Sequence, residues 1–398
     1  MGRLIVEDLI TEGKSKICLL VIDGLGDIPK DRPTPLEAAQ TPNLDAITPK
    51  SALGLLDPVQ VGVTPGSGPG HLALFGYDPI RYKIGRGLLE ALGVGIEVGP
   101  LDLCLRANFA TKEGEIVVDR RAGRITTEEC VRLCQKLEGI DHIEDVRIRI
   151  RPGKEHRFVV VFTGEGLSDA VTDADPQRSG KELVKAEPLT SKAEKTARII
   201  NQYISMSADI LKGEPRANFI LLRGAAAHPK LRSFPDRYRM KALAIATFPM
   251  YLGIGKLVGM ETLNPGPGIT QLFVSYQKNY DDYDFFYIHI KETDKAGEDG
   301  NYEEKIRIIE DIDHNLHILV DKAPDVLAIT ADHSTPVSLR SHSWHPCPIL
   351  IHSRYLPSDG LNRFTEKNCC LGSLGRIAGI DLMPILLASG LRLKKYGA

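Results

Sequence analysis

Four largely apolar runs lie near the two ends of the chain, and polar residues do not alternate with apolar ones in them. They span residues 17–22, 285–290, 326–330 and 348–351. Continuous runs of this length are typical of strands that are buried on both faces of a parallel sheet. An amphipathic helical pattern at 303–319 separates two of them. The pattern predicts an α/β sheet that is assembled from both ends of the sequence.

The middle of the chain follows a different pattern, in which apolar and charged residues alternate. Segments 115–118 and 146–150 read as half-exposed strands, and 158–162 adds a third strand. A capping box at 126–129 leads into an amphipathic helix. Another helix start follows Pro188, which we take as the far boundary of this region. The middle is therefore predicted to be a small inserted α+β unit.

The length of 398 residues also favours about two domains, because a single hydrophobic core seldom serves a chain this long. We predict a discontinuous catalytic domain, residues 1–110 and 188–398, whose core sheet has helices on both faces. The inserted α+β domain is predicted to span residues 111–187.

Composition excludes several classes of partner. The chain has 50 basic and 52 acidic residues, and this balance provides no overall field to hold nucleic acid or an anionic membrane. The seven cysteines lack the paired spacing of a zinc ribbon and are expected to be reduced thiols. We find no signal peptide and no apolar run near the roughly 18 residues that span a bilayer. A cytoplasmic protein with a small-molecule substrate is expected, and the low Asn and Gln content hints at a thermophile.

Ser67 is the first candidate for chemistry. It lies in the glycine-rich run Thr64–His71, just ahead of a predicted helix. Flanking glycines allow close approach to its hydroxyl, and the amides at a helix N-terminus favour an anion such as phosphate. Such clusters more often form simple turns, so the run alone does not decide. His71, one helical turn later, either contacts a substrate or packs.

Acidic residues and histidines follow the predicted buried strands. Asp23 directly follows the first run, Asp294 comes soon after the second, and Asp332 with His333 follows the third, near His342. Ligands bind at the carboxyl ends of strands in open α/β sheets. Carboxylates mixed with imidazoles are typical ligands of zinc, manganese or a related divalent ion. Five such groups are too many for one ion, so the pattern favours a two-metal site at which Ser67 is the nucleophile.

The order and spacing of several segments resemble the archaeal-type, 2,3-bisphosphoglycerate-independent phosphoglycerate mutases of the alkaline phosphatase superfamily. The resemblance covers nearly the whole chain and implies an alkaline-phosphatase-like core sheet. The similar segments are residues 21–27, 41–45, 66–71, 106–109, 119–124, 222–225 and 330–334.

The resemblance implies a ligand set for two divalent ions, which are Mn, Co or Zn, with Mg possible. One ion is expected to bind Asp23, Ser67, Asp332 and His333, and the other Asp294, His342 and residue 298. Where the family pattern has histidine, this chain has Glu298, which favours manganese or cobalt over zinc, with Asp299 as an alternative ligand.

The implied reaction interconverts 3-phosphoglycerate and 2-phosphoglycerate through a phosphoserine, without 2,3-bisphosphoglycerate. The alternative is a metal-dependent phosphomonoesterase or phosphodiesterase of the same superfamily. A mobile, cationic lid is expected to retain glycerate and exclude water. The candidate substrate-binding residues are Arg106, Arg120, Arg121, Arg124, Arg178, Arg223 and Lys241.

Overall fold

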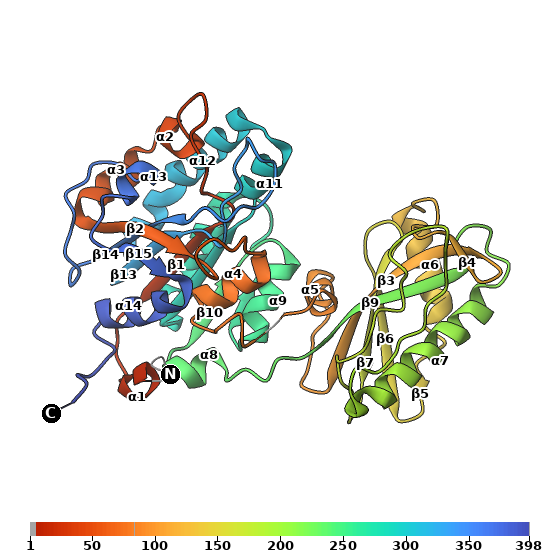
Figure 1. The fold of residues 1–398 in the computed structure, drawn as a ribbon. Helices are drawn as coiled ribbons and strands as arrows, with labels where there is room; N and C mark the ends of the chain where they lie inside the picture. The colour runs from red at the N-terminus through yellow and green to blue at the C-terminus, as the bar shows by residue number, and fades with distance from the viewer. Residues whose placement is uncertain (1–4, 83, 398) are drawn as a thin grey trace. The chain divides into compact units, whose positions relative to one another are not determined.

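The computed structural model describes residues 5–82 and 84–397 and divides the chain into two compact units (Figure 1). Unit 1 is formed by the two terminal segments, up to Lys83 and from Leu231, and unit 2 by Ile84–Lys230. Each unit has its own sheet and its own hydrophobic core. Unit 1 is thus built from both ends of the chain, with bounds that differ from the predicted residues 1–110 and 188–398.

Unit 1 contains an eight-stranded sheet in the order β11-β10-β12-β1-β13-β14-β2-β15. All four apolar runs form strands in it. The strands are β1 (Ile17–Ile22), β2 (Ser51–Asp57), β10 (Ala242–Ile245), β11 (Glu261–Leu263), β12 (Phe285–Ile290), β13 (Val326–Thr330), β14 (Cys347–Ser353) and β15 (Gly375–Ala378). Strand β1 pairs in parallel with β12 and β13, so the three strands end at the same edge of the sheet.

Both faces of this sheet are covered by helices. The even-numbered residues of β1 pack against apolar side chains of α10 (Ile269–Asn279) and α12 (Tyr302–Asp321). The odd-numbered residues are also fully buried, on the face where Figure 1 shows α4 (Ser67–Leu74), α9 (Pro249–Leu257) and α14 (Leu382–Ser389). The other helices of this unit are α1 (Ile5–Leu9), α2 (Pro35–Ala38), α3 (Pro42–Ile47), α8 (Phe234–Tyr238), α11 (Glu292–Asp299) and α13 (Glu366–Cys369).

Unit 2 is an α+β unit with a seven-stranded sheet in the order β5-β6-β7-β3-β4-β8, in which β9 also pairs with β3. Helix α6 begins after Thr126, whose side chain accepts a hydrogen bond from the Glu129 amide as the capping box predicts. The strands are β3 (Asp102–Glu113), β4 (Ile116–Asp119), β5 (His142–Ile143), β6 (Val146–Pro152), β7 (Arg157–Thr163), β8 (Lys181–Glu182) and β9 (Phe219–Ala227). The helices are α5 (Arg86–Gly93), α6 (Thr127–Leu137) and α7 (Glu194–Leu211).

Unit 2 is larger than the predicted insertion of residues 111–187. Strand β3 begins at Asp102 and pairs with both β7 and β9, so its first half cannot belong to unit 1 without breaking the sheet. Helix α7, which the sequence analysis placed in the main domain, packs its apolar face into the core of unit 2. The pairing of β3 with β9 joins segments that are more than 100 residues apart, and no local pattern marks it.

No helix among the residues 5–82 and 84–397 combines the length and the apolarity needed to cross a membrane.

A buried network behind the carboxyl edge of the unit 1 sheet fixes the loop after β1. The Lys305 ammonium contacts Asp27 Oδ2 at 3.0 Å and donates to the Thr335 carbonyl at 3.0 Å. The Asp27 amide donates to Glu366 Oε1, and the Thr34 hydroxyl donates to Glu366 Oε2. The network therefore connects the loops after β1 and β13 to α12 and α13.

Replacing Glu366 with glutamine tests this network. Burial raises the pKa of Glu366 from 4.5 to about 7. A carboxyl with a raised pKa contributes its full stability only below its ordinary pKa and loses that contribution as the pH rises to about 7. Glutamine can accept from the Asp27 amide through its oxygen and donate to the Thr34 hydroxyl through its nitrogen, and it does not ionise. We expect the stability of Glu366→Gln relative to the native protein to grow by about 1 to 3 kcal/mol between about pH 5 and about pH 8, as measured by urea unfolding. A difference that is independent of pH would contradict this.

Replacing Gly70 with alanine tests the packing of α4 on the segment after β13. A Cβ at Gly70 would lie 2.4 Å from the Asp332 carbonyl oxygen, so the helix must shift. We expect a loss of about 1 to 3 kcal/mol in the free energy of unfolding. Gly66→Ala is the control, because its Cβ would meet only Pro69 Cδ at 3.9 Å. It is expected to cost less than about 1 kcal/mol, from the weaker N-cap preference of alanine. Equal losses in the two variants would contradict the predicted clash.

Candidate functional site

The carboxyl edge of the unit 1 sheet collects the predicted ligands. Asp23 directly follows β1, and its amide donates to the Ile290 carbonyl at the end of β12. Asp294 lies in the first turn of α11, just after β12, and Asp332 with His333 follows β13. Because these strands are parallel and in register, residues far apart in the sequence meet at one edge.

The first ligand group is formed by Asp23, Asp332 and His333, all of them fully buried. His333 Nε2 lies 3.2 Å from Asp23 Oδ1 and 3.3 Å from Asp332 Oδ2. Ser67 Oγ, at the start of α4, lies 3.3 Å from the same nitrogen. Asp23 Oδ1 and both Asp332 carboxylate oxygens have no hydrogen-bond partner among the described residues. Acceptors that are buried without donors in this way suit a cation.

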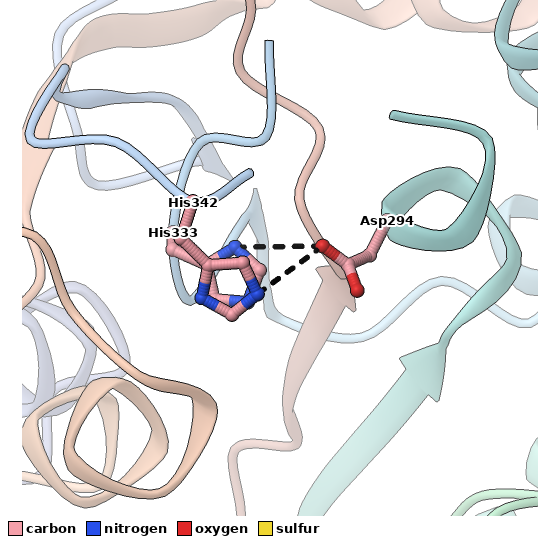
Figure 2. A group of neighbouring side chains, drawn as sticks. All are labelled: Asp294, His333 and His342. Atoms are coloured by element: carbon pink, nitrogen blue, oxygen red, sulfur yellow. Dashed lines mark ion pairs between the residues drawn. The ribbon is translucent and has the colours of Figure 1, made fainter. Parts of the chain in front are cut away.

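The second group is formed by Asp294, His333 and His342 (Figure 2). Figure 2 shows both imidazoles beside the Asp294 carboxylate, whose Oδ1 lies 3.6 Å from His342 Nε2 and 3.8 Å from His333 Nδ1. The two rings stack with their centroids 3.5 Å apart. His342 Nδ1 donates to the Pro65 carbonyl at 3.1 Å, which leaves the Nε2 lone pair directed toward Asp294. His333 thus belongs to both groups, whereas the sequence analysis assigned it to one.

Glu298 lies at the edge of the second group. Its Oε1 is 3.9 Å from His342 Nε2, and its side chain is 54% exposed. Asp299 instead lines a separate surface cavity of about 760 Å³, together with Lys295 and Arg307. Of the two carboxylates that the sequence leaves open, Glu298 is the one beside the imidazoles.

The electrostatics of the first group indicate an excess of negative charge. Burial and the nearby Asp23 charge raise the pKa of Asp332 well above its ordinary value. Burial would also raise the pKa of Asp23, but the hydrogen bond with His289 and the adjacent His333 imidazole hold it well below the usual range. Burial disfavours protonation of His333, yet Asp332 and Asp23 outweigh this effect and raise its pKa to about 9. These carboxylates draw positive charge toward themselves.

This donor set fits divalent metal ions. It combines carboxylate oxygens, imidazole nitrogens and a serine hydroxyl within a few ångströms of one another, the mixture that zinc, manganese and cobalt accept. The carboxylate oxygens of Asp332 and Asp23 that lack hydrogen-bond partners support this fit independently.

The structure adds four residues that the sequence analysis did not assign to the site. Tyr251, from α9, donates to Asp23 Oδ2 at 2.5 Å, and His289 Nε2 lies 3.1 Å from the same oxygen. The Thr335 hydroxyl donates to Asp294 Oδ1 at 2.6 Å, and the Lys291 ammonium contacts Asp294 Oδ2. Lys291 and Thr335 lie within three residues of predicted ligands, and this proximity in the sequence could have identified them as candidates. Tyr251 has no local signal, since only the fold brings α9 to this edge.

The His71 side chain contacts the backbone of Ser67 within α4. Its Nδ1 lies 2.7 Å from the Ser67 carbonyl and 3.4 Å from Asp332 Oδ2. The ring is fully buried, and burial lowers the pKa of His71 to about 3, so the imidazole is neutral. Of the two possibilities left open by the sequence, packing under the first turn of α4 describes this residue.

Lys241 lies at the wrong edge of the sheet. It precedes β10, whose first residue Ala242 pairs with Phe285 at the start of β12. The ligands follow the opposite ends of these parallel strands. The Lys241 ammonium is exposed and lies 3.6 Å from Glu261 Oε1. Strand direction thus places Lys241 a full strand length from the ligands, which does not favour the prediction that it binds the substrate.

Three of the candidate arginines lie near one another in unit 2, two on the sheet and Arg120 in the turn after β4. Arg106 and Arg223 stand opposite each other on β3 and β9, and the Nε atom of each is buried without a hydrogen-bond partner among the described residues. Arg120 forms a bidentate pair with the buried Asp175, whose Oδ2 is 3.8 Å from Arg223 Nε. Burial and the Arg223 charge lower the pKa of Arg106, although Glu90 opposes this. The cluster is short of counter-charge and suits an anion.

The other three arginines are exposed on unit 2. Arg124 adopts a left-handed backbone conformation, with φ of 53°, and lines a small surface cavity together with Glu129 and Glu214. Arg121 lies in the turn between β4 and α6, and Arg178 lies in a bend between β7 and β8. Their exposure distinguishes these three from Arg106, Arg120 and Arg223, whose side chains are largely buried.

Comparisons with known proteins agree on one family. Residues 49–217 match the family model described as 2,3-bisphosphoglycerate-independent phosphoglycerate mutase. Proteins named as probable members from Thermotoga maritima and Aquifex aeolicus are 55% and 49% identical to the chain. Each alignment covers 99% of this chain, and it covers 98% of the Thermotoga protein and 100% of the Aquifex protein.

Solved structures give the same result. The cofactor-independent phosphoglycerate mutase from Thermoplasma acidophilum aligns with a TM-score of 0.79 at 32% identity, over 94% of this chain and 100% of its own. A protein from Pyrococcus horikoshii aligns with a TM-score of 0.80 at 30% identity, over 97% and 100%. With relatives this similar over nearly its whole length, the chain belongs to the 2,3-bisphosphoglycerate-independent phosphoglycerate mutase family.

Proposed function

We propose that this protein interconverts 3-phosphoglycerate and 2-phosphoglycerate through a phosphoserine formed on Ser67. The observation that carries the proposal is the position of Ser67 Oγ, 3.3 Å from His333 Nε2 and beside two groups of carboxylates and imidazoles that share His333. A nucleophilic oxygen next to paired ligand groups is the arrangement that in-line phosphoryl transfer requires. The relatives in the mutase family, through their names and their sequence identity to this chain, give the proposal a second line of support.

Two divalent ions, Mn, Co or Zn with Mg possible, fit the site. When bound, they would favour the ionised serine hydroxyl and offset charge on the phosphoryl oxygens. The residues that would hold them are Asp23, Ser67, Asp332 and His333 for one ion and Asp294, Glu298 and His342 for the other. His333 Nδ1 faces the Thr335 hydroxyl at 3.0 Å, which leaves the Nε2 lone pair to face Ser67 and the first group.

The reaction proceeds in two balanced half-reactions. In the first, a bond forms between Ser67 Oγ and phosphorus while the bond from phosphorus to glycerate O3 breaks. Ser67 loses its proton, and glycerate O3 gains one. In the second, glycerate O2 loses its proton and forms a bond to the phosphorus of the phosphoserine while the Oγ–phosphorus bond breaks, and Ser67 recovers a proton. Because Ser67 carries the phosphoryl group, 2,3-bisphosphoglycerate is not needed.

We also propose that unit 2 binds the anionic groups of the substrate. Arg106 and Arg223 support this, since adjacent guanidinium groups with unpartnered Nε atoms suit a carboxylate or a phosphate. The pairing of Arg120 with Asp175 would hold the cluster in place. We retain the assignment of the chain to the archaeal type, which the alignment with the Thermoplasma enzyme supports.

Replacing Ser67 with alanine tests the phosphoserine route. The native protein, loaded with manganese or cobalt and given 3-phosphoglycerate, should form 2-phosphoglycerate with little inorganic phosphate. Ser67→Ala should lose at least about a thousandfold in kcat, because the nucleophile is absent. The control is Ser341→Ala, which removes an exposed hydroxyl that donates only to the Leu339 carbonyl. It should keep native activity.

Two results would contradict the proposal. Phosphate release without isomerisation would identify a phosphomonoesterase instead. Retained isomerisation in Ser67→Ala, with the fold intact by circular dichroism, would exclude Ser67 as the phosphoryl carrier.

A further inference from the structure

The Lys291 side chain contacts a carboxylate in each of the two ligand groups. It is the residue directly after β12, and because Ile290 pairs with Ile22 the parallel register places it next to Asp23. Its ammonium lies 2.5 Å from Asp294 Oδ2 and 3.2 Å from Asp23 Oδ2. One cation therefore contacts one carboxylate from each group.

The two oxygens of each carboxylate have separate partners. Asp23 Oδ1 faces His333 Nε2 at 3.2 Å, and Asp294 Oδ1 faces His342 Nε2 at 3.6 Å. Lys291 contacts the other oxygen, Oδ2, of each. The ammonium thus holds both carboxylates without occupying the oxygens that face His333 and His342.

A cation at this position reduces the repulsion between the buried carboxylates. Asp23, Asp294 and Asp332 lie close together with at most 1% of each side chain exposed, where like charges repel strongly. Without a counter-ion, the carboxylates would separate or take up protons. The Lys291 side chain is 21% exposed, so its charge has access to solvent while the carboxylates do not.

We propose that Lys291 is a positioning residue that acts as the internal counter-ion of the site and sets the distance between the two ligand groups. It keeps the Oδ1 atoms of Asp23 and Asp294 aimed at the imidazoles before any metal ion binds. This inference rests on the proposed two-metal function for its role in catalysis, but the effect of Lys291 on the metal-free protein does not. Two-metal chemistry requires ligands held to within about 0.5 Å, which a bridging ammonium provides.

Replacing Lys291 with methionine tests the proposal, because methionine keeps much of the apolar stem and removes the charge. In metal-stripped protein, Lys291→Met should lower the Tm by about 3 °C or more. Added Mn²⁺ supplies positive charge, so the loss should be at least halved in loaded protein. Lys291→Arg should recover most of the Tm. Lys295→Met, the same change at an exposed position one turn along α11, should leave both Tm values and the activity unchanged.

Two further measurements separate positioning from packing. Lys291→Met should lower kcat at least tenfold and change KM for 3-phosphoglycerate less than twofold, since Lys291 acts on the ligands. In metal-stripped protein, Lys291→Met should cost less than half as much Tm in an Asp294→Asn background as in the native one. If Lys291→Met alone does not fold, folding of this double variant supports the proposal, and its failure to fold overturns it.

Equal Tm losses with and without Mn²⁺, or an undiminished loss in the Asp294→Asn background, would overturn the proposal. Failure of the proposed function would look different. There the metal-free Tm effects would remain as predicted, while neither the native protein nor any variant would isomerise 3-phosphoglycerate.

Discussion

Buried negative charge at the carboxyl edge of the unit 1 sheet is the constraint on which the rest of the site depends. The parallel strands β1, β12 and β13 end together and deliver Asp23, Asp294 and Asp332 to one place that water does not reach. Burying a carboxylate without a partner is costly, and three that adjoin one another are costlier still. The three carboxylates are buried at one point of the fold, and the neighbouring groups reduce the free-energy cost of their burial.

These groups approach the carboxylates from different directions. Imidazoles face Oδ1 of Asp23 and Oδ1 of Asp294, and Tyr251, His289 and Lys291 hold Asp23 Oδ2. The two oxygens of Asp332 are left without hydrogen bonds. The compensation is therefore incomplete where Ser67 approaches His333. A site that is nearly but not fully neutralised binds metal cations readily, and metal cations can in turn draw in an anionic substrate.

Unit 2 presents the opposite imbalance. Arg106 and Arg223 stand side by side, while the buried Asp175 is engaged by Arg120. The chain as a whole is almost neutral, with a formal net charge of −2, so these charges act locally. An excess of guanidinium of this kind suits a carboxylate or a phosphate.

The sequence by itself determined the features that depend on neighbouring residues. The apolar runs became buried strands because uninterrupted hydrophobicity is stable only where both faces are covered, and the acids after them reached one edge because parallel strands end together. The loop of Ser67 was readable from its glycines, and the family was readable from the order of its motifs. Only the tertiary structure decided the extent of unit 2, the sharing of His333, the contribution of Tyr251 and the bridging position of Lys291. It also placed Lys241 at the far edge. Each of these depends on pairing, register or strand direction between segments distant in the sequence, and such contacts form only when the whole chain folds.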